Sequence, residues 1–316
     1  MSSTPAVATT APSRPVRRLG DRIFSSVALI AGLLILVALA AVAVFLIGES
    51  IPAAKAGKDV LPQGFTNFLQ YAWPLVFGTV WAAVLSLVIA VPLSLGIALF
   101  ISHYAPRRLA RGLGYVIDLL AAVPSVVYGL WGITVLAPFV QPFYSFLNRY
   151  LGWIPLFGGS VSATGRTVLT VAIVLAVMVL PIITALCREV FLQTPRLQEE
   201  AALALGATRW EMIRMSVLPF GRAGIVSAVM LGLGRALGET LAVALVLSPA
   251  VVVSFFMLTT QNPTTIAANI ALQFPDSYGT SVNVLIATGL VLFVLTFVVN
   301  ALARIIVART AVGKGL

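Results

Sequence analysis

Residues 224–247 read GIVSAVMLGLGRALGETLAVALVL, and the only charged side chains in this apolar stretch are Arg235 and Glu239. About 20 apolar residues in a helix are enough to cross the roughly 30 Å hydrocarbon core of a bilayer. Within lipid, a spanning segment must satisfy its own backbone amides, which favours a helix. The stretch therefore predicts a membrane-spanning helix that carries two charges.

Similar apolar runs recur along the whole chain. Its 316 residues are 60% hydrophobic and 9% charged, whereas soluble domains carry about 25% charged residues. The sequence predicts an all-α integral membrane protein with six transmembrane helices. Residues 1–22 are expected to form a disordered cytoplasmic tail, and residues 23–310 a transmembrane domain. Within it we expect spans at about 24–48, 74–101, 113–138, 167–187, 223–249 and 283–307.

The positive charges predict the orientation in the membrane. Fifteen of the 20 Lys and Arg residues lie before the first span, after the second, fourth or sixth span, and four lie in the other loops. Because Lys and Arg are enriched in cytoplasmic loops, both termini and the 188–222 loop are expected in the cytoplasm. The net charge of +10 is then explained by topology in the lipid bilayer, and we expect no nucleic-acid partner.

The loop at residues 194–219, TPRLQEEAALALGATRWEMIRMSVLP, has the pattern of two short helices. A Thr-Pro pair is suited to open the first helix, and Gly206 to end it. The TRWE segment has the spacing of a capping box and starts a second helix, which Pro219 is expected to end. We interpret the unit as a helix–turn–helix lever for a cytoplasmic partner. DNA binding, another use of such a unit, is disfavoured because both ends are tethered to spans.

One pattern in this loop, E-A-A followed by three residues and G, and later L-P, is that of the EAA loop. On this pattern the chain resembles the type I ABC importer permeases, the MetI-like family, although Ser216 stands where the family usually has isoleucine. In that family the loop is the coupling helix, which docks into a groove on a separate ATPase subunit. The resemblance thus implies ATPase coupling by Glu200, Ala201, Ala202, Gly206 and Pro219.

Arg235 is expected near mid-depth in the membrane, about 18 Å from Ala223 at roughly 1.5 Å per residue. A central arginine costs about 2.5–3.5 kcal/mol on insertion, and such residues face a bundle interior or a water-filled cavity. Glu239 follows one helical turn later and is expected on the same face, within reach. Two interpretations stay open. The two residues form a structural ion pair, or Arg235 binds an oxyanion and Glu239 pairs with Arg235 when no anion is bound.

Several separated segments carry a more specific resemblance. LGRALGET, VPSVVYGLWGI (residues 123–133), TRWEMIRMSVLPF and NPTTIAANIALQF are similar to segments of the C-type permease subunit of phosphate-specific ABC importers. The resemblance implies that Arg235 and Glu239 serve phosphate translocation. It also implies a bacterial inner membrane and three protein partners: a second permease subunit forming a heterodimer, a cytoplasmic ATPase dimer and an extracytoplasmic phosphate-binding protein.

Other chemistries are disfavoured by the sequence. No G-x4-G-K-[ST] phosphate loop occurs in the sequence. We therefore expect a transport subunit that has no ATPase site of its own and is not an enzyme. The single histidine, His103, falls in a basic loop near the cytoplasmic interface and is expected to be solvated. The single cysteine, Cys187, can form no internal disulfide. We expect no catalytic residues, no metal site and no cofactor.

Two alternatives to a phosphate importer remain at this point. A permease for another oxyanion, such as molybdate or sulfate, would use the same guanidinium chemistry. An ion-coupled secondary transporter would explain the spans and the buried charges, and it predicts an inverted repeat and discontinuous helices. It would leave residues 194–219 without a role.

Overall fold

The computed structural model of the chain describes residues 19–54, 57, 60–61 and 64–312. These residues are mainly helical, with two strands of two residues each. Most of the tail expected to be disordered, residues 1–22, lies outside the described residues. Residues 19–22 differ from that expectation, because they already belong to the first helix.

The chain divides into two compact units, residues 1–48 and 49–316. Most of the first helix, α1 (Leu19–Ala54), belongs to the first unit. Its apolar side chains surround the whole helix, which is typical of a segment surrounded by lipid. The site described below lies entirely in the second unit.

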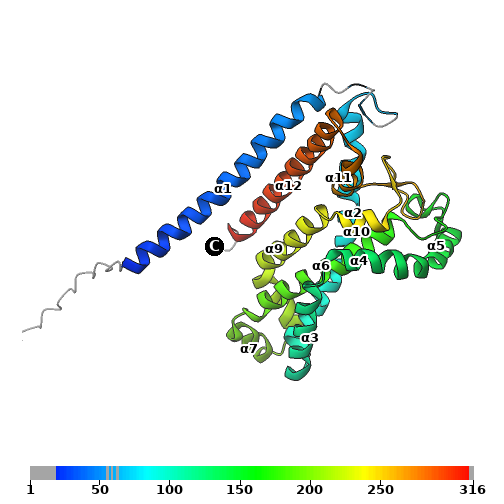
Figure 1. The fold of residues 1–316 in the computed structure, drawn as a ribbon. Coiled ribbons are helices and arrows are strands. Elements are labelled where there is room, and N and C mark those ends of the chain that lie inside the picture. Colours follow the sequence, from blue (N-terminus) through cyan, green and yellow to red (C-terminus); the bar gives the residue numbers. More distant parts are fainter. Residues whose placement is uncertain (1–18, 55–56, 58–59, 62–63, 313–316) are drawn as a thin grey trace, which may run out of the picture. The chain divides into compact units, whose positions relative to one another are not determined.

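The second unit contains helices, three short π-helical segments (η1, η2, η4), two 3-10 turns (η3, η5) and two strands, shown in Figure 1. They follow in the order α2 (Phe68–Leu99), η1 (Phe100–Tyr104), α3 (Arg107–Ala121), α4 (Ser125–Trp131), η2 (Gly132–Leu136), α5 (Ala137–Leu151), η3 (Pro155–Phe157), α6 (Val168–Leu192), α7 (Arg196–Ala204), α8 (Arg209–Met212), η4 (Ile213–Val217), α9 (Leu218–Leu237), α10 (Leu241–Val246), β1 (Pro249–Ala250), β2 (Asn262–Pro263), α11 (Ile266–Gln273), η5 (Phe274–Asp276) and α12 (Thr280–Val312).

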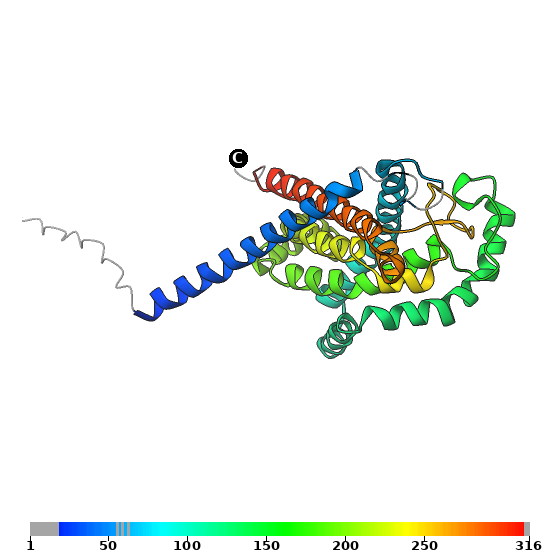
Figure 2. The same cartoon turned by 45° about the horizontal axis from the view of Figure 1, so that its top comes forward.

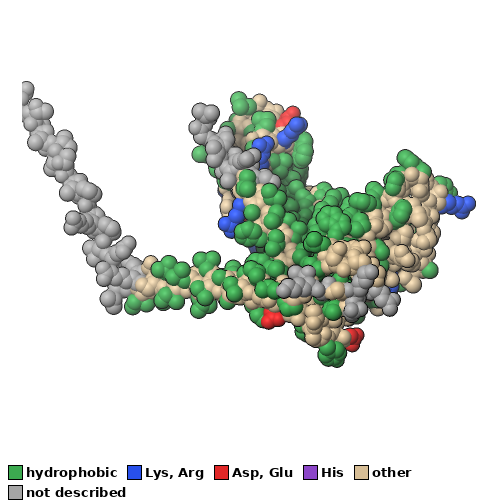
Figure 3. Space-filling view, turned by 90° about the horizontal axis from the view of Figure 1, so that it is seen from above, with side chains coloured by type: hydrophobic (Ala, Val, Ile, Leu, Met, Phe, Trp, Pro, Cys, Tyr) green, Lys and Arg blue, Asp and Glu red, His purple; other side chains and the backbone are tan. Residues whose placement is uncertain are grey.

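Six helices in the described part of the chain are long and apolar enough to cross a membrane, which confirms the expected fold class. They are Ile23–Ala53, Phe68–Tyr104, Ser125–Leu151, Val168–Leu192, Arg209–Leu237 and Thr280–Ile305. On the face shown in Figure 3, hydrophobic side chains cover much of the surface, while Lys and Arg are confined to a few places. Such a surface suits a protein that is surrounded by lipid.

The third span differs from the expected range of 113–138. Residues up to Ala121 belong to α3, and a new helix begins at Ser125. Pro124 has no backbone N–H and disfavours helical backbone at the residue before it, so the break falls at Val123 and Pro124. The candidate span therefore runs through α4, η2 and α5 to Leu151, into the segment that the sequence assigned to an outer loop.

Helix α6 is the centre of the second unit, and it packs against α2 and α9. Its neighbour α2 presents small buried residues at every fourth position: Ala82, Ser86, Ala90, Ser94 and Ala98. On the α9 side, a Cβ added to Gly232 would lie 2.7 Å from Ile183 Cδ1. Small residues allow helix backbones to approach closely, which is how helices in lipid commonly associate.

The segment after α10 folds back onto α2 and the start of α6. Strands β1 and β2 pair in parallel, with Pro249 opposite Asn262. Figure 2 shows this segment, in orange, beside the green chain that follows α5, and the amide of Ser162 donates to the carbonyl of Leu258 at 2.8 Å. Asn262 is fully buried and accepts a hydrogen bond from the amide of Val168 at 2.9 Å. This contact ties β2 to the start of α6.

Candidate functional site

The fifth span is interrupted at the position of its two charges. The sequence predicted one helix over 223–249, but α9 ends at Leu237 and a separate helix, α10, begins at Leu241. Gly238 lies at the C-terminal end of α9, where its backbone N–H bonds back to Gly234 and Ala236 carbonyls. Glycine has a low helix propensity. The backbone N–H and C=O groups that lose their helical partners at such a break are tolerated in a membrane where protein or a cavity satisfies them.

Glu239 lies in this break and is buried, with 8% of its surface exposed. Its Oε1 accepts a hydrogen bond from the backbone N–H of Ala242 at 3.1 Å, so the carboxyl group satisfies a free amide in the first turn of α10. The expectation that Glu239 lies on the same helical face as Arg235 is wrong, because the helix ends between them. Among the described residues no ion pair joins the two side chains.

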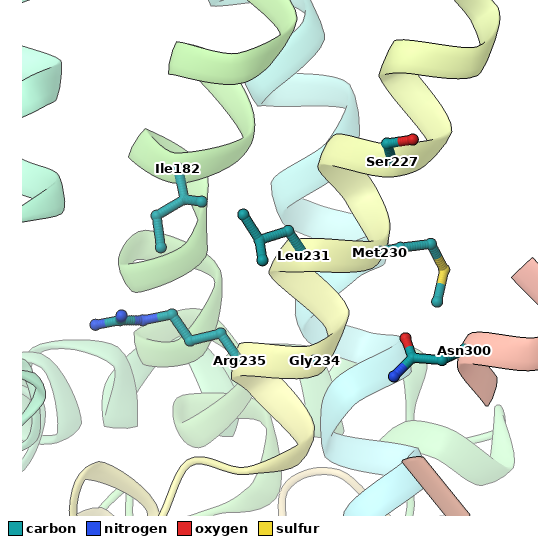
Figure 4. A pocket seen from close by; sticks show the side chains of 7 residues that line it. All are labelled: Ile182, Ser227, Met230, Leu231, Gly234, Arg235 and Asn300. Atoms are coloured by element: carbon teal, nitrogen blue, oxygen red, sulfur yellow. The ribbon is translucent and has the colours of Figure 1, made fainter. Parts of the chain in front are cut away.

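Arg235 is exposed on the surface of this chain and lines a hollow of about 470 Å³ between α6, α9 and α12. In Figure 4 its side chain extends from α9 toward the side of Ile182, while Asn300 of α12 lies on the other side of Gly234. The lining is mainly apolar and includes three polar side chains, those of Ser227, Arg235 and Asn300; the other lining residues are Ile182, Met230, Leu231 and Gly234. No hydrogen bond of the guanidinium group is found within the described part of the chain.

The second break, between α3 and α4, lies close to the first. The hydroxyl of Tyr128 on α4 donates to the carbonyl of Leu120 on α3 at 2.9 Å, across the break. The segments that follow the two breaks, α4 and α10, pack against each other.

Glycines allow α4 to pack closely against its neighbours. A Cβ on Gly129 would lie 2.9 Å from the Cα of Ala242 on α10. A Cβ on Gly132 would lie 2.7 Å from Val174 of α6 and 2.8 Å from Val246 of α10. The two glycines of VPSVVYGLWGI thus hold α10 against α4 and α6, which explains in physical terms why this segment needs small residues.

The other end of α10 is held by Arg166. Its guanidinium group donates to the carbonyls of Leu245, Val246 and Leu247 at 3.3, 3.2 and 3.0 Å. These carbonyls have no partner within the helix, and a cation at a helix C-terminus is favoured by the helix dipole. Helix α10 is therefore fixed by Glu239 at its start and by Arg166 at its end.

The predicted helix–turn–helix is present as α7 and the helix that begins with α8. Gly206 has a φ of +86°, and the amides of Gly206 and Ala207 bond to the carbonyls of Leu203 and Ala202, which is a Schellman motif. The capping box of Thr208 and Glu211 is confirmed. The prediction that Pro219 ends the second helix is wrong: Pro219 lies in the first turn of α9, where its missing N–H costs little.

The other residues of the EAA pattern divide between two faces of α7. Glu200 and Ala201 are exposed, whereas Ala202 is buried with 6% of its surface accessible. Large apolar side chains nearby are also exposed, including Leu197 at 79% and Leu205 at 88%. Exposed apolar groups of this kind, rimmed by charges, are typical of a surface that contacts another protein.

The comparison with known proteins identifies the family. The sequence profile of the family described as "Binding-protein-dependent transport system inner membrane component" matches residues 90–312. The chain belongs to this family. As a binding-protein-dependent inner membrane component, it is a multi-pass inner-membrane protein and a transport component that works with an ATPase and other subunits.

Relatives within the family are more specific. The chain is 48% identical over 308 residues to "Phosphate transport system permease protein PstC 2" of Mycobacterium tuberculosis, covering 93% of each chain. It is 39% identical over 297 residues to "Phosphate transport system permease protein PstC" of Xylella fastidiosa, covering 90% of this chain and 91% of that one. The resemblance to C-type permease subunits that the sequence motifs indicated is confirmed.

Solved structures show the same fold at low sequence identity. A bacterial ABC transporter involved in the import of the acidic polysaccharide alginate has a chain that matches with a TM-score of 0.60 at 18% identity, covering 93% of this chain and 99% of that one. A chain of the inward-facing MetNI methionine ABC transporter matches with a TM-score of 0.52 at 16% identity, covering 77% and 95%. The present chain thus shares one helical fold with these two chains.

Three side chains near the site were missed by sequence reasoning: Tyr128, Arg166 and Asn300. Arg166 was counted only among the few positive charges outside the cytoplasmic loops. Tyr128 and Asn300 lie in apolar runs, where the sequence does not show which other residues a single polar side chain approaches. A polar side chain within a span was the available signal, since such groups are costly in lipid and usually face the bundle interior.

Proposed function

We propose that the chain is the C-type permease subunit of an ATP-driven importer of inorganic phosphate and forms half of its translocation pathway. The observation that carries the proposal is the guanidinium group of Arg235. It lies in a hollow near the end of α9, without a hydrogen-bond partner in the described part of the chain. The names of the PstC relatives and their high identity support phosphate as the anion.

The chemistry of phosphate fits this guanidinium group. Arginine presents five N–H donors in a planar fork that matches two oxygens of a phosphate, and its charge is not lost on titration. The apolar walls of Ile182, Met230 and Leu231 strengthen the attraction, because a charge interaction grows as the surrounding dielectric falls. In this proposal Arg235 contacts phosphate, and Glu239 serves translocation by holding the start of α10 rather than by holding Arg235.

Residues 194–219 are proposed as the coupling loop of a permease domain that comprises residues 23–310. Glu200, Ala201 and Ala202 would form the contact with a cytoplasmic ATPase dimer, supported by the exposed apolar side chains beside them. Gly206 would set the turn between the two helices, and Pro219 would lie within the fifth span, in the first turn of α9. In this arrangement the ATPase performs the hydrolysis, and the permease has no enzymatic activity of its own.

The remaining partners follow from the same proposal. A second, different permease subunit would close the hollow beside Arg235, which is open at Gly234 in this chain. An extracytoplasmic phosphate-binding protein would deliver phosphate to the outer mouth. Both termini would lie in the cytoplasm, as the distribution of Lys and Arg predicts.

Uptake of radiolabelled phosphate by the complete transporter tests the proposal. Arg235→Ala is expected to abolish uptake, and Arg235→Lys to lower it strongly, because lysine keeps the charge but not the fork. Arg149→Lys is the matched control, since Arg149 is an exposed arginine at the end of α5. Normal uptake by both Arg235 variants, at unchanged membrane levels, would disprove the role of Arg235.

Competition by other anions separates phosphate from the second candidate, an importer of molybdate or sulfate. A single guanidinium group recognises charge and paired oxygens, which all three anions share. Inhibition of phosphate uptake by excess phosphate but not by sulfate or molybdate is expected. Uptake of radiolabelled sulfate or molybdate in place of phosphate would favour the second candidate.

A further inference from the structure

His103 is not a solvated loop residue, contrary to the sequence-based expectation. It lies in η1, at the end of the second span, and its Nε2 is 3.3 Å from Oε1 of Glu199 on α7. The side chains are 9% and 22% exposed. Within the described part of the chain this is the only pair of oppositely chargeable side chains in contact.

The histidine ring is held on both sides. Its Nδ1 lies 2.7 Å from the hydroxyl of Ser102, and that hydroxyl is 2.8 Å from the carbonyl of Ala98, one turn earlier in the same helix. The ring is thus contacted at both nitrogens, by Ser102 at Nδ1 and by Glu199 at Nε2. A ring fixed in this way transmits a displacement of Glu199 to the second span, which carries His103.

Glu199 and Glu200 are neighbours on α7, but they serve different sides of the helix. Glu200 is exposed, whereas Glu199 is half-buried and faces the second span through His103. Successive residues in a helix are about 100° apart, so one short helix presents one carboxylate outward and the other inward. A force applied to the outer face of α7 is therefore delivered to His103 by the next residue along.

A second hydrogen bond joins α7 to a span: the hydroxyl of Ser216 donates to the carbonyl of Gln198 at 3.4 Å. Ser216 lies in η4 and His103 in η1, so both contacts are made by π-helical segments. Such segments are wider than an α-helical turn and occur frequently at functional positions. Helix α7 is thus attached to the second and fifth spans at their two irregular turns.

We propose that His103 is a positioning residue that joins the coupling helix α7 to the second span, so that movement of α7 shifts α2 together with the core helix α6. The contact supplies a direct connection to α2, whereas the peptide chain connects α7 only to α6 and to α8. Helix α2 transmits the displacement because it packs along α6, and Ser94 donates to the carbonyl of Leu180 at 3.1 Å. The proposal rests on the proposed function, because it requires an ATPase that moves α7.

The test uses the complete transporter in proteoliposomes and measures ATP hydrolysed per phosphate taken up. Loss of the contact in His103→Ala or Glu199→Ala is expected to raise this ratio by about threefold or more, the size of one partly exposed ion pair. The double variant is expected to be no worse than either single variant, because both remove the same contact. Tyr104→Phe, an exposed neighbour in η1, and Glu189→Ala, at an exposed carboxylate on α6, are the matched controls.

A charge exchange separates positioning from simple support of the fold. His103→Glu combined with Glu199→Lys restores an ion pair of opposite direction and is expected to restore the ratio, as is His103→Lys alone. If the single variants fail to assemble, the complex with the exchanged pair is measured instead. The proposal is overturned if this complex assembles but has a raised ratio. It is also overturned if this complex does not assemble. An unchanged ratio in both single variants overturns it as well.

Failure of the proposed function gives a different result. A wild-type complex that hydrolyses ATP without taking up phosphate disproves the phosphate importer, whatever the variants do. If that complex imports another oxyanion, the same ratio is measured for that anion, and the role of His103 is tested on it. A wild-type complex that imports phosphate with variants of unchanged ratio disproves only the role of His103.

Discussion

The carboxyl group of Glu239 accepts a hydrogen bond from the backbone amide of Ala242 at 3.1 Å and thereby starts helix α10, instead of pairing with Arg235. Arg235 and Glu239 consequently have different roles. Arg235 is left without a carboxylate partner in the described part of the chain, next to a hollow. Glu239 keeps the break between α9 and α10 in place. The two side chains should therefore respond differently to substitution.

Replacing Glu239 by glutamine is expected to preserve most of the uptake of phosphate, because the amide oxygen of glutamine accepts the same hydrogen bond. Glu239→Ala removes the acceptor and leaves a buried amide unpaired, at a cost of about 1 kcal/mol. Uptake is expected to fall roughly fivefold if that energy is lost from the transport-competent state. Measured initial rates of uptake decide between the two roles. If glutamine is as harmful as alanine, the carboxylate charge itself is needed, and the capping role is wrong.

Arg166 should matter although it lies 79–81 residues before the carbonyls that it binds at the end of α10. Arg166→Gln removes charge-assisted hydrogen bonds to three carbonyls at the end of α10. The expected loss is about 2 kcal/mol, seen as a lower midpoint of thermal unfolding in detergent and as reduced uptake. Arg149→Gln, which removes an exposed arginine, should leave both unchanged. Equal behaviour of the two variants would show that Arg166 does not hold α10.

Much of the fold was predictable from the sequence, because crossing a membrane depends on the length of an apolar run, a local property. The capping box at Thr208 and the turn at Gly206 were predictable for the same reason: each depends on residues within one helical turn. The breaks at Val123–Pro124 and Gly238 were not located. A proline or glycine inside a span ends a helix only where neighbouring segments satisfy the freed groups.

The remaining errors concern contacts between distant segments. Arg166 reaches carbonyls 79–81 positions away, and His103 meets Glu199 across 96 positions. Nothing in the spacing of either residue indicates these partners. The hypothesis of an Arg235–Glu239 ion pair failed because helical spacing was assumed through Gly238. In each case the packing of α4, α10 and α7 determines which residues come into contact. Composition and periodicity do not describe this packing.

The turn at Gly206 offers a test of the coupling loop. At a φ of +86°, a residue with a Cβ is strained by about 1–2 kcal/mol, whereas asparagine tolerates this region. No atom lies within 4 Å of the position of a Cβ on Gly206, so the strain is conformational rather than steric. Gly206→Val is expected to raise the ATP hydrolysed per phosphate imported, and Gly206→Asn to change it little. Similar ratios for both variants would mean that the backbone conformation at Gly206 is not required for coupling.

The packing of α4 against α10 gives the sharpest prediction about the broken helices. A Cβ on Gly129 would lie 2.9 Å from the Cα of Ala242, a backbone atom that cannot move without displacing α10. Gly129→Ala is therefore expected to cost about 1–3 kcal/mol and to shift the amide that Glu239 binds. Gly112→Ala is the matched control, since a Cβ there meets nothing within 4 Å and α3 gains helix propensity.

Uptake of phosphate and thermal unfolding, measured side by side on both glycine variants, separate packing from general helix effects. Loss of uptake in Gly129→Ala with little change in Gly112→Ala is expected. Combining Gly129→Ala with Ala242→Gly removes the Cβ of residue 242 but leaves its Cα in place, so only partial recovery is expected. Full activity of Gly129→Ala would show that α10 is free to move away from α4, and that the position of the break is not fixed by this contact.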